Sequence, residues 1–227
     1  MRLNPLFSKM VSLSEALETI TDGTSLMYGG FGGIGSPADL IAEIMNKGVR
    51  DLALIGNDAG FPDAGIGRLI TNGQVKSLIT SHIGSNPVAG QQMMDGTLTI
   101  EFFPQGILAE KIRAGGVGLP GIIVDVGMGT IVEDGKQKVK LNGGTYLVEP
   151  ALTADVGIVY AKRADTYGNL IFDKTARNLN PLVAMACEVT IVEVEELVPV
   201  GELDPEMIVT PGIYVDYIVQ RNGGETR

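Results

Sequence analysis

Residues 27–37, MYGGFGGIGSP, place five glycines between an apolar run and a proline. Glycine has no Cβ atom, so such a stretch can turn tightly or let a ligand approach its amides. The apolar residues 25–28 before it predict a short buried strand. Ser36 and Pro37 after it predict a helix start, with Ser36 as the N-cap and Pro37 as the first helical residue. We therefore expect the loop to join a strand to a helix.

The rest of the chain alternates between short apolar runs and helical stretches. Helices are predicted at 12–20, where Ser12 and Glu15 form a capping box, and at 37–47, 66–73, 86–96, 104–116 and 180–186. Strands are predicted at 51–56, 75–80, 98–103, 155–162, 170–174, 189–198 and 215–219. This alternation predicts an α/β fold: an open, mostly parallel sheet with helices on both faces.

Residues 129–150 break this rhythm. They consist of strand-like pieces joined by Asp134-Gly135 and Gly143-Gly144, dipeptides that are typical of hairpin turns. The sequence therefore predicts an antiparallel β flap inserted into the parallel fold.

Composition narrows the class of protein. The chain has 227 residues, which predicts a single domain over 1–227, and a net charge of −10, which disfavours nucleic acid and anionic membranes as partners. Its apolar runs are shorter than the roughly 20 residues of a membrane helix. The single Cys187 cannot form an internal disulfide and lies in an apolar stretch, where we expect an inert core thiol. Without a secretory pattern at the first residues, the expected compartment is the cytoplasm.

Three interpretations of the glycine loop compete. Residues 30–35 match G-x-G-x-x-G, and Asp58 follows Gly35 by 23 residues, close to the spacing of about 20 at which a dinucleotide-binding unit holds a ribose. A bare loop before a helix N-terminus is also an anion site, which a phosphorylated ligand would use. A tight turn alone is the third interpretation, and it would explain only one or two of the five glycines.

Several separated motifs resemble the α subunit of the family I coenzyme A transferases, in the same order. They are Asp22-Gly23-x-x-Leu26-Met27-Tyr28-Gly29-Gly30-Phe31-x-x-x-Gly35-x-Pro37, Gly56-Asn57-Asp58-Ala59-Gly60, Ser81-His82-Ile83-Gly84-Ser85-Asn86-Pro87, Pro104-Gln105-Gly106-x-Leu108-Ala109-Glu110-Lys111-Ile112-Arg113-Ala114-Gly115-Gly116, Ala176-Arg177-Asn178-x-Asn180-Pro181 and Thr210-Pro211-Gly212. The resemblance covers essentially the whole chain. It is therefore far more specific than the glycine loop alone.

The resemblance implies an enzyme that moves coenzyme A between short-chain acids such as acetate, acetoacetate, butyrate or succinate. Family members form a glutamyl thioester on a glutamate in a Ser-Glu-Asn-Gly motif of the β subunit. This sequence has no such motif. The resemblance therefore implies a β-subunit partner in an α2β2 assembly, with coenzyme A as a substrate and no tightly bound cofactor. A nicotinamide-dependent oxidoreductase and a non-catalytic sensor of phosphorylated metabolites stay open as alternatives.

The resemblance also implies roles for particular residues. Gln105 is expected to donate a hydrogen bond to the oxyanion, and Asn57 to border the acyl pocket. The expected coenzyme A-binding residues are Gly29, Gly30, Phe31, Gly32, Gly33, Ile34 and Gly35.

Other polar residues are expected to have ordinary roles. Glu101 is predicted to be a solvated or partner-paired carboxylate, and the single His82 to be structural. Lys111, Arg113 and Arg177 are predicted to be mainly surface cations, and the alternative is that one or more of them faces the partner subunit or the coenzyme phosphates. With no second histidine or cysteine cluster, no metal site is expected.

Overall fold

An eight-stranded sheet forms the centre of the computed structural model, which describes residues 8–221. Its main path runs through β11 (Tyr217–Gln220), β10 (Cys187–Val198), β8 (Ala154–Asp165), β1 (Ser25–Tyr28), β2 (Leu52–Ile55), β3 (Val75–Thr80) and β4 (Thr99–Phe102). These strands are parallel, and the short β9 (Leu170–Ile171) pairs antiparallel with β8. The predicted open, mostly parallel sheet is confirmed.

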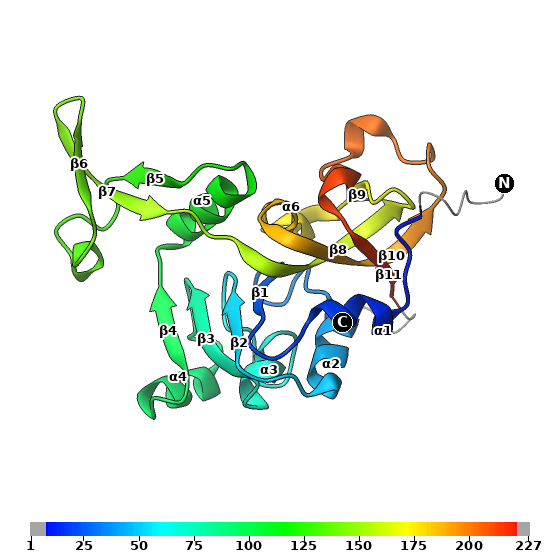
Figure 1. Cartoon of the computed structure of the whole chain (residues 1–227), viewed down its shortest axis with the longest axis horizontal. Helices are drawn as coiled ribbons and strands as arrows, with labels where there is room; N and C mark the ends of the chain where they lie inside the picture. The colour runs from blue at the N-terminus through cyan, green and yellow to red at the C-terminus, as the bar shows by residue number, and fades with distance from the viewer. Residues whose placement is uncertain (1–7, 222–227) are drawn as a thin grey trace.

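Helices cover both faces of the sheet (Figure 1). One hydrophobic core includes residues of α1 (Leu13–Ala16), α2 (Ala38–Lys47), α3 (Gly67–Thr71) and α4 (Pro87–Met94), and the other includes residues of α5 (Gln105–Gly116) and α6 (Asn180–Met185). In β1, Leu26 and Tyr28 belong to the first core and Met27 to the second, because successive side chains of a strand point to opposite faces.

Short 3₁₀ turns complete several connections. They are η2 (Leu17–Thr19), η3 (Ile131–Glu133), η4 (Lys174–Arg177), η5 (Pro205–Met207) and η6 (Gly212–Tyr214). The predicted capping box at the first helix is confirmed on one side, since the Ser12 side chain accepts from the Glu15 amide. The helix itself is shorter than predicted and continues as η2.

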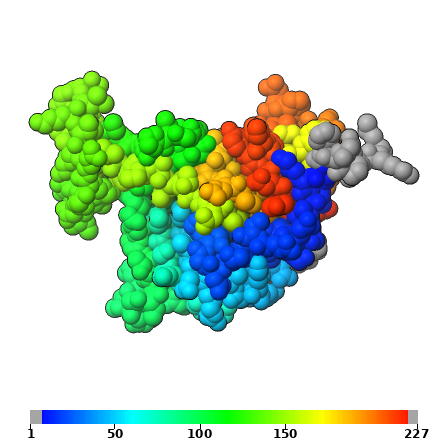
Figure 2. Space-filling model, in the orientation of Figure 1, coloured from blue at the N-terminus to red at the C-terminus, as the bar shows by residue number. Residues whose placement is uncertain are grey.

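The predicted antiparallel flap is present as a second sheet, in the order β5 (Gly121–Val124), β7 (Gly144–Pro150), β6 (Lys138–Leu141). It projects away from the main sheet (Figures 1 and 2). It begins with β5, earlier than predicted. Its tight turn is Asn142-Gly143, at φ 49° and 79°, so the prediction of a turn at Gly143-Gly144 was wrong by one residue. An Asn-Gly pair with two positive φ angles matches the twist of a two-residue hairpin.

The parallel strands fix where a site can form. The carboxyl ends of β1, β2, β3 and β4 lie at one edge of the sheet, and open sheets of this type bind ligands in the crevice outside that edge. Within residues 8–221, no helix has the length and apolar character needed to cross a membrane.

Candidate functional site

The glycine loop follows β1 at the carboxyl edge of the sheet. Phe31 and Ile34 form an isolated bridge, with reciprocal N–H to O distances of 3.0 and 3.1 Å, so the loop is a miniature hairpin. The Phe31 and Ile34 side chains are 52% and 56% exposed at its tip. The backbone therefore turns back on itself and presents two apolar side chains to solvent.

Each of the five glycines has a structural reason. Gly30, Gly32, Gly33 and Gly35 have φ angles between 55° and 116°, a region that favours glycine. A Cβ on Gly29 would lie 1.7 Å from the Asn180 Oδ1 atom. The expectation that a turn explains only one or two of the glycines was wrong.

The start of α2 also differs from the prediction. Pro37 is the N-cap, without a side-chain cap, and Ala38 is the first helical residue, so Ser36 does not cap the helix. The buried Glu193 of β10 caps it instead, since its Oε2 atom accepts from the amides of Asp39 at 2.8 Å and Leu40 at 2.9 Å. These two amides are therefore not available to a ligand phosphate.

Glu193 belongs to a charged cluster beside the loop. Its Oε1 atom lies 3.7 Å from the Nε atom of Arg221, and the Arg221 Nη1 atom lies 3.5 Å from Glu195. Glu195 also accepts from the Tyr160 hydroxyl at 2.7 Å and pairs with Lys162. Burial raises the pKa of Glu193 to about 7, against the lowering effect of the α2 amides and Arg221.

The pKa of Glu195 is lowered, in contrast to the raised pKa of Glu193. Burial alone would raise its pKa, but the hydrogen bonds from Lys162 and Tyr160 outweigh it and lower the pKa. Glu195, Tyr160 and Arg221 line an open groove together with the glycine loop. This groove therefore has a backbone-rich wall and a charged wall.

Two asparagines hold the glycine loop from the other side. Asn178 accepts from the Gly30 amide at 3.1 Å and donates to the Ile34 carbonyl at 2.9 Å. Asn180 donates to the Gly35 carbonyl at 2.9 Å. The motif that contains them was noticed in the sequence, but its contact with the loop was not predicted, because the two segments lie far apart in the chain.

A second loop of similar form lies beside the first. Gly60 and Gly65 have positive φ angles, and Phe61 and Ala64 form a bridge like that of Phe31 and Ile34. Both loops line the same groove, and Phe61 is 44% exposed. The sequence offered one signal for this pairing, which is the recurrence of Gly-Phe followed by glycine four residues after the phenylalanine.

Asp58 ties the two loops together. Its Oδ2 atom accepts from the Gly32 amide at 2.8 Å and from the Asn57 side chain at 2.9 Å, and its Oδ1 atom accepts from the Gly60 amide at 2.9 Å. The Asp58 residue is only 7% exposed. The acidic residue that the dinucleotide interpretation requires is thus already occupied in bracing backbone.

Asn57 follows β2 and His82 follows β3, whereas Glu101 lies within β4. Asn57 is 2% exposed, and its Oδ1 atom accepts no hydrogen bond from the described residues. His82 is exposed, and its ring lies over Gly84. Glu101 is exposed on the edge strand β4, as predicted for a solvated carboxylate.

Gln105 opens α5 directly after the carboxyl end of β4. Gln105 is exposed, and its side chain makes no hydrogen bond with residues 8–221. The amide is therefore accessible to a ligand at the predicted edge. Gln105 and the glycine loop lie at opposite ends of the four-strand run β1-β2-β3-β4, so a ligand that touches both must extend along the edge.

The structure supports the prediction for Cys187 and contradicts the prediction for Lys111. Cys187 is a free cysteine, and burial raises its pKa to about 12, which agrees with an inert thiol. Lys111 is 3% exposed, so the prediction that it is a surface cation was wrong.

In the part of the chain that the structure describes, no group of three or more histidine, cysteine or acidic side chains could hold a metal ion.

Comparison with known proteins gives consistent matches along the chain. The family model described as Coenzyme A transferase matches residues 10–221. A probable coenzyme A transferase subunit alpha of Bacillus subtilis (strain 168) is 56% identical over 218 residues, which cover 96% of this chain and 95% of that protein. The acetate CoA-transferase subunit alpha of Escherichia coli (strain K12) is 49% identical over 212 residues, or 93% of this chain and 96% of that protein.

A solved structure extends the likeness to three dimensions. The acyl-CoA transferase YdiF of Escherichia coli O157:H7, in a thioester complex with CoA, matches with a TM-score of 0.85 at 25% identity. The match covers 96% of this chain but 48% of that chain, so this chain spans about half of YdiF. These comparisons support neither the oxidoreductase nor the metabolite-sensor alternative.

Proposed function

Because the chain belongs to the coenzyme A transferase family, we propose that it is the α subunit of an enzyme that moves coenzyme A between short-chain carboxylic acids. The observation that carries the proposal is the 49% identity, along 93% of the chain, to the α subunit of an acetate CoA-transferase. We take acetate, acetoacetate, butyrate and succinate as the candidate acids. In this proposal coenzyme A is a substrate, no cofactor is tightly bound, and the enzyme works in the cytoplasm.

The proposed enzyme needs a second polypeptide. The sequence contains no Ser-Glu-Asn-Gly motif, and the chain corresponds to about half of the YdiF chain. A β subunit would supply the missing half and the nucleophilic glutamate, in an α2β2 assembly. This division explains why the chain presents an exposed amide at Gln105, at the carboxyl edge of the sheet, without the glutamate of a Ser-Glu-Asn-Gly motif.

The proposed reaction divides one exchange into easier steps. The glutamate of the β subunit attacks the acyl thioester and expels the coenzyme A thiolate, which leaves a mixed anhydride. The thiolate then attacks the glutamyl carbonyl of the anhydride and releases the first acid. The acceptor acid takes the coenzyme through the same steps in reverse order.

Gln105 would act on the oxygen that becomes negative in each attack. Its side-chain amide is exposed at the start of α5 and has no other hydrogen-bond partner among the described residues. A single placed donor of this kind stabilises an oxyanion by about 2.7–4 kcal/mol, which corresponds to a factor of about 10²–10³ in rate.

The glycine loop would bind coenzyme A through its own amides. The α2 amides of Asp39 and Leu40 are occupied by Glu193, but the amides of Gly33 and Gly35 donate to no other described residue. Phe31 and Ile34 add apolar surface beside them. The loop could therefore contact both an anionic and an apolar part of the coenzyme.

Asn57 would border the acyl pocket from its buried position after β2. It is buried at the carboxyl end of β2, and its Oδ1 atom is an acceptor without a partner among residues 8–221. A buried amide oxygen of this kind is usually satisfied, so a protonated group of the substrate or an ordered water is the expected partner.

Co-expression with the β subunit tests the proposal. The assembled enzyme should transfer coenzyme A from acetoacetyl-CoA to acetate, and this chain by itself should be inactive. Borohydride treatment after addition of acyl-CoA should modify a glutamate of the β subunit. Activity of this chain alone, or modification of Glu101, would refute the division of the site.

A further inference from the structure

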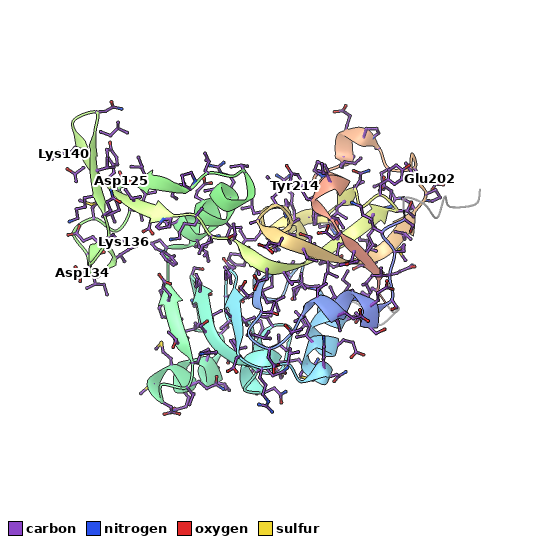
Figure 3. All side chains as sticks on the ribbon, in the orientation of Figure 1. Asp125, Asp134, Lys136, Lys140, Glu202 and Tyr214 are labelled. Carbon is purple, nitrogen blue, oxygen red and sulfur yellow. The ribbon has the colours of Figure 1, made fainter. Side chains whose placement is uncertain are left out.

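A buried charged cluster lies where the flap meets α5. The Lys111 Nζ atom of α5 is 3.0 Å from the Glu149 Oε2 atom of β7, and their side chains are 4% and 2% exposed. The other carboxylate oxygen of Glu149 pairs with Lys136, which lies on the flap just before β6 and is 22% exposed (Figure 3). Two cations thus share one buried carboxylate.

Both cations also face the ring of Phe103. The Lys111 Nζ atom lies 4.0 Å from the ring centroid, and the Lys136 Nζ atom lies 5.1 Å from it. Phe103 is 5% exposed and continues the β4 pairing, since its amide donates to the Thr80 carbonyl at 3.0 Å. The ring therefore connects the charged cluster to the end of the sheet.

This cluster lies beside residues 103–105, the corner where the chain passes from β4 into α5 and exposes Gln105. Phe103, Pro104 and Gln105 are consecutive, and Lys111 follows Gln105 by six residues on α5, a rise of about 9 Å. No side chain among the described residues holds the Gln105 amide. Its position consequently depends on the backbone of the corner, which Phe103 fixes on the sheet side and Lys111 on the helix side.

We propose that Lys111 is a positioning residue for Gln105, and that Glu149 and Lys136 hold it in place. The inference rests on the proposed role of Gln105 as oxyanion donor. A buried ion pair gives little net stability, because desolvation offsets the attraction, so stability alone is a weak reason for this cluster. What the cluster does is lock the flap, α5 and the end of β4 in one arrangement.

The alternative is that Lys111 only supports the fold. In that case its replacement would lower stability without a specific effect on the step that Gln105 serves. A positioning role makes a different prediction, because the effect of Lys111 on the rate must pass through the Gln105 amide. Two such variants are then not independent of each other.

A double-mutant cycle on the assembled enzyme separates these cases. Lys111→Met, Gln105→Ala and the double variant are compared for kcat, for KM of acyl-CoA and for melting temperature. Lys111→Met leaves Glu149 paired with Lys136, so no buried carboxylate loses all its partners. Lys138→Met is the matched control, because Lys138 is a flap lysine whose pair with Glu133 is partly exposed, with side chains 43% and 24% exposed.

We expect Gln105→Ala to lower kcat about 100-fold and Lys111→Met about 10-fold, with KM unchanged. The double variant should be no slower than Gln105→Ala. The control should keep the original kcat. If the kcat losses of the two single variants multiply in the double variant, the positioning role of Lys111 is refuted while the oxyanion role of Gln105 stands. If Gln105→Ala leaves kcat unchanged, both roles are refuted.

Lys136→Met provides a second route if Lys111→Met does not fold. It keeps the Lys111–Glu149 pair and removes only the partly exposed cation of the flap. We expect a kcat loss of a few-fold that disappears in the Gln105→Ala background. A loss that persists there would contradict the inference.

Discussion

Replacing Glu193 with glutamine should remove a pH dependence from the stability of this chain. Glu193 is fully buried, and its Oε2 atom caps α2 through the amides of Asp39 and Leu40. A glutamine has the same shape and keeps an oxygen acceptor for both amides. The substitution therefore changes the charge and its titration while the cap can remain.

The expected magnitude follows from the raised pKa. Burial moves the pKa of Glu193 from the ordinary value of 4.5 to about 7. The folded chain thus holds a proton that the unfolded chain has released, so the free energy of unfolding falls as the pH rises between these two values. A tenfold change in proton affinity is worth about 1.4 kcal/mol, so the loss amounts to about 3 kcal/mol and is complete above the folded pKa.

Urea unfolding of the original chain and of Glu193→Gln, followed by circular dichroism between about pH 5 and pH 8, measures this difference. Relative to the original chain, the variant should become more stable by up to about 3 kcal/mol as the pH rises across that range. Arg221 and Glu195 face the same cluster and are present in both proteins, and the attraction of Arg221 to the ionised Glu193 is already included in the pKa of about 7. Glu202→Gln is the control, because Glu202 is exposed (Figure 3). A difference in stability that does not change with pH would refute the argument.

Three further predictions concern the loops and the cysteine. Asp58→Asn should raise the KM for acyl-CoA in the assembled enzyme, because one carboxylate oxygen becomes an NH₂ group that cannot accept, so a loop amide such as that of Gly32 loses its acceptor; an unchanged KM would contradict this. Gly35→Ala should destabilise the chain by about 3 kcal/mol or more in urea unfolding, because its Cβ would lie 2.5 Å from the Ala176 carbonyl oxygen at a φ of 73°. Gly32→Ala, at a φ of 55° but in open space, should lose only about 1 kcal/mol, and equal losses would argue against the close approach at Gly35. Cys187 should resist iodoacetamide at about pH 8, because burial raises its pKa to about 12, and rapid labelling measured by mass spectrometry would contradict an inert thiol.

The sequence by itself determined the fold class and the family. Apolar runs separated by helical stretches predict parallel βαβ units, because each helix returns the chain to the same edge of the sheet. The positions of β1, β2 and β3 follow from short local runs bounded by glycine or polar residues. Those signals are local, so they survive without knowledge of distant contacts, although the predicted flap began eight residues too late, at 129 instead of 121, and its turn one residue too late.

Only the tertiary structure decided which groups satisfy the loop and the helix that follows it. Ser36 was the local candidate for the cap of α2, but Glu193 lies more than 150 residues away and takes that role. Asn178 reaches the glycine loop across a similar separation. The burial of Lys111 was equally invisible, because a lysine in a helix looks like a surface residue until Glu149 is placed beside it. Hydrogen bonds and ion pairs depend on distance in space, and the spacing of residues along the chain contains no measure of it.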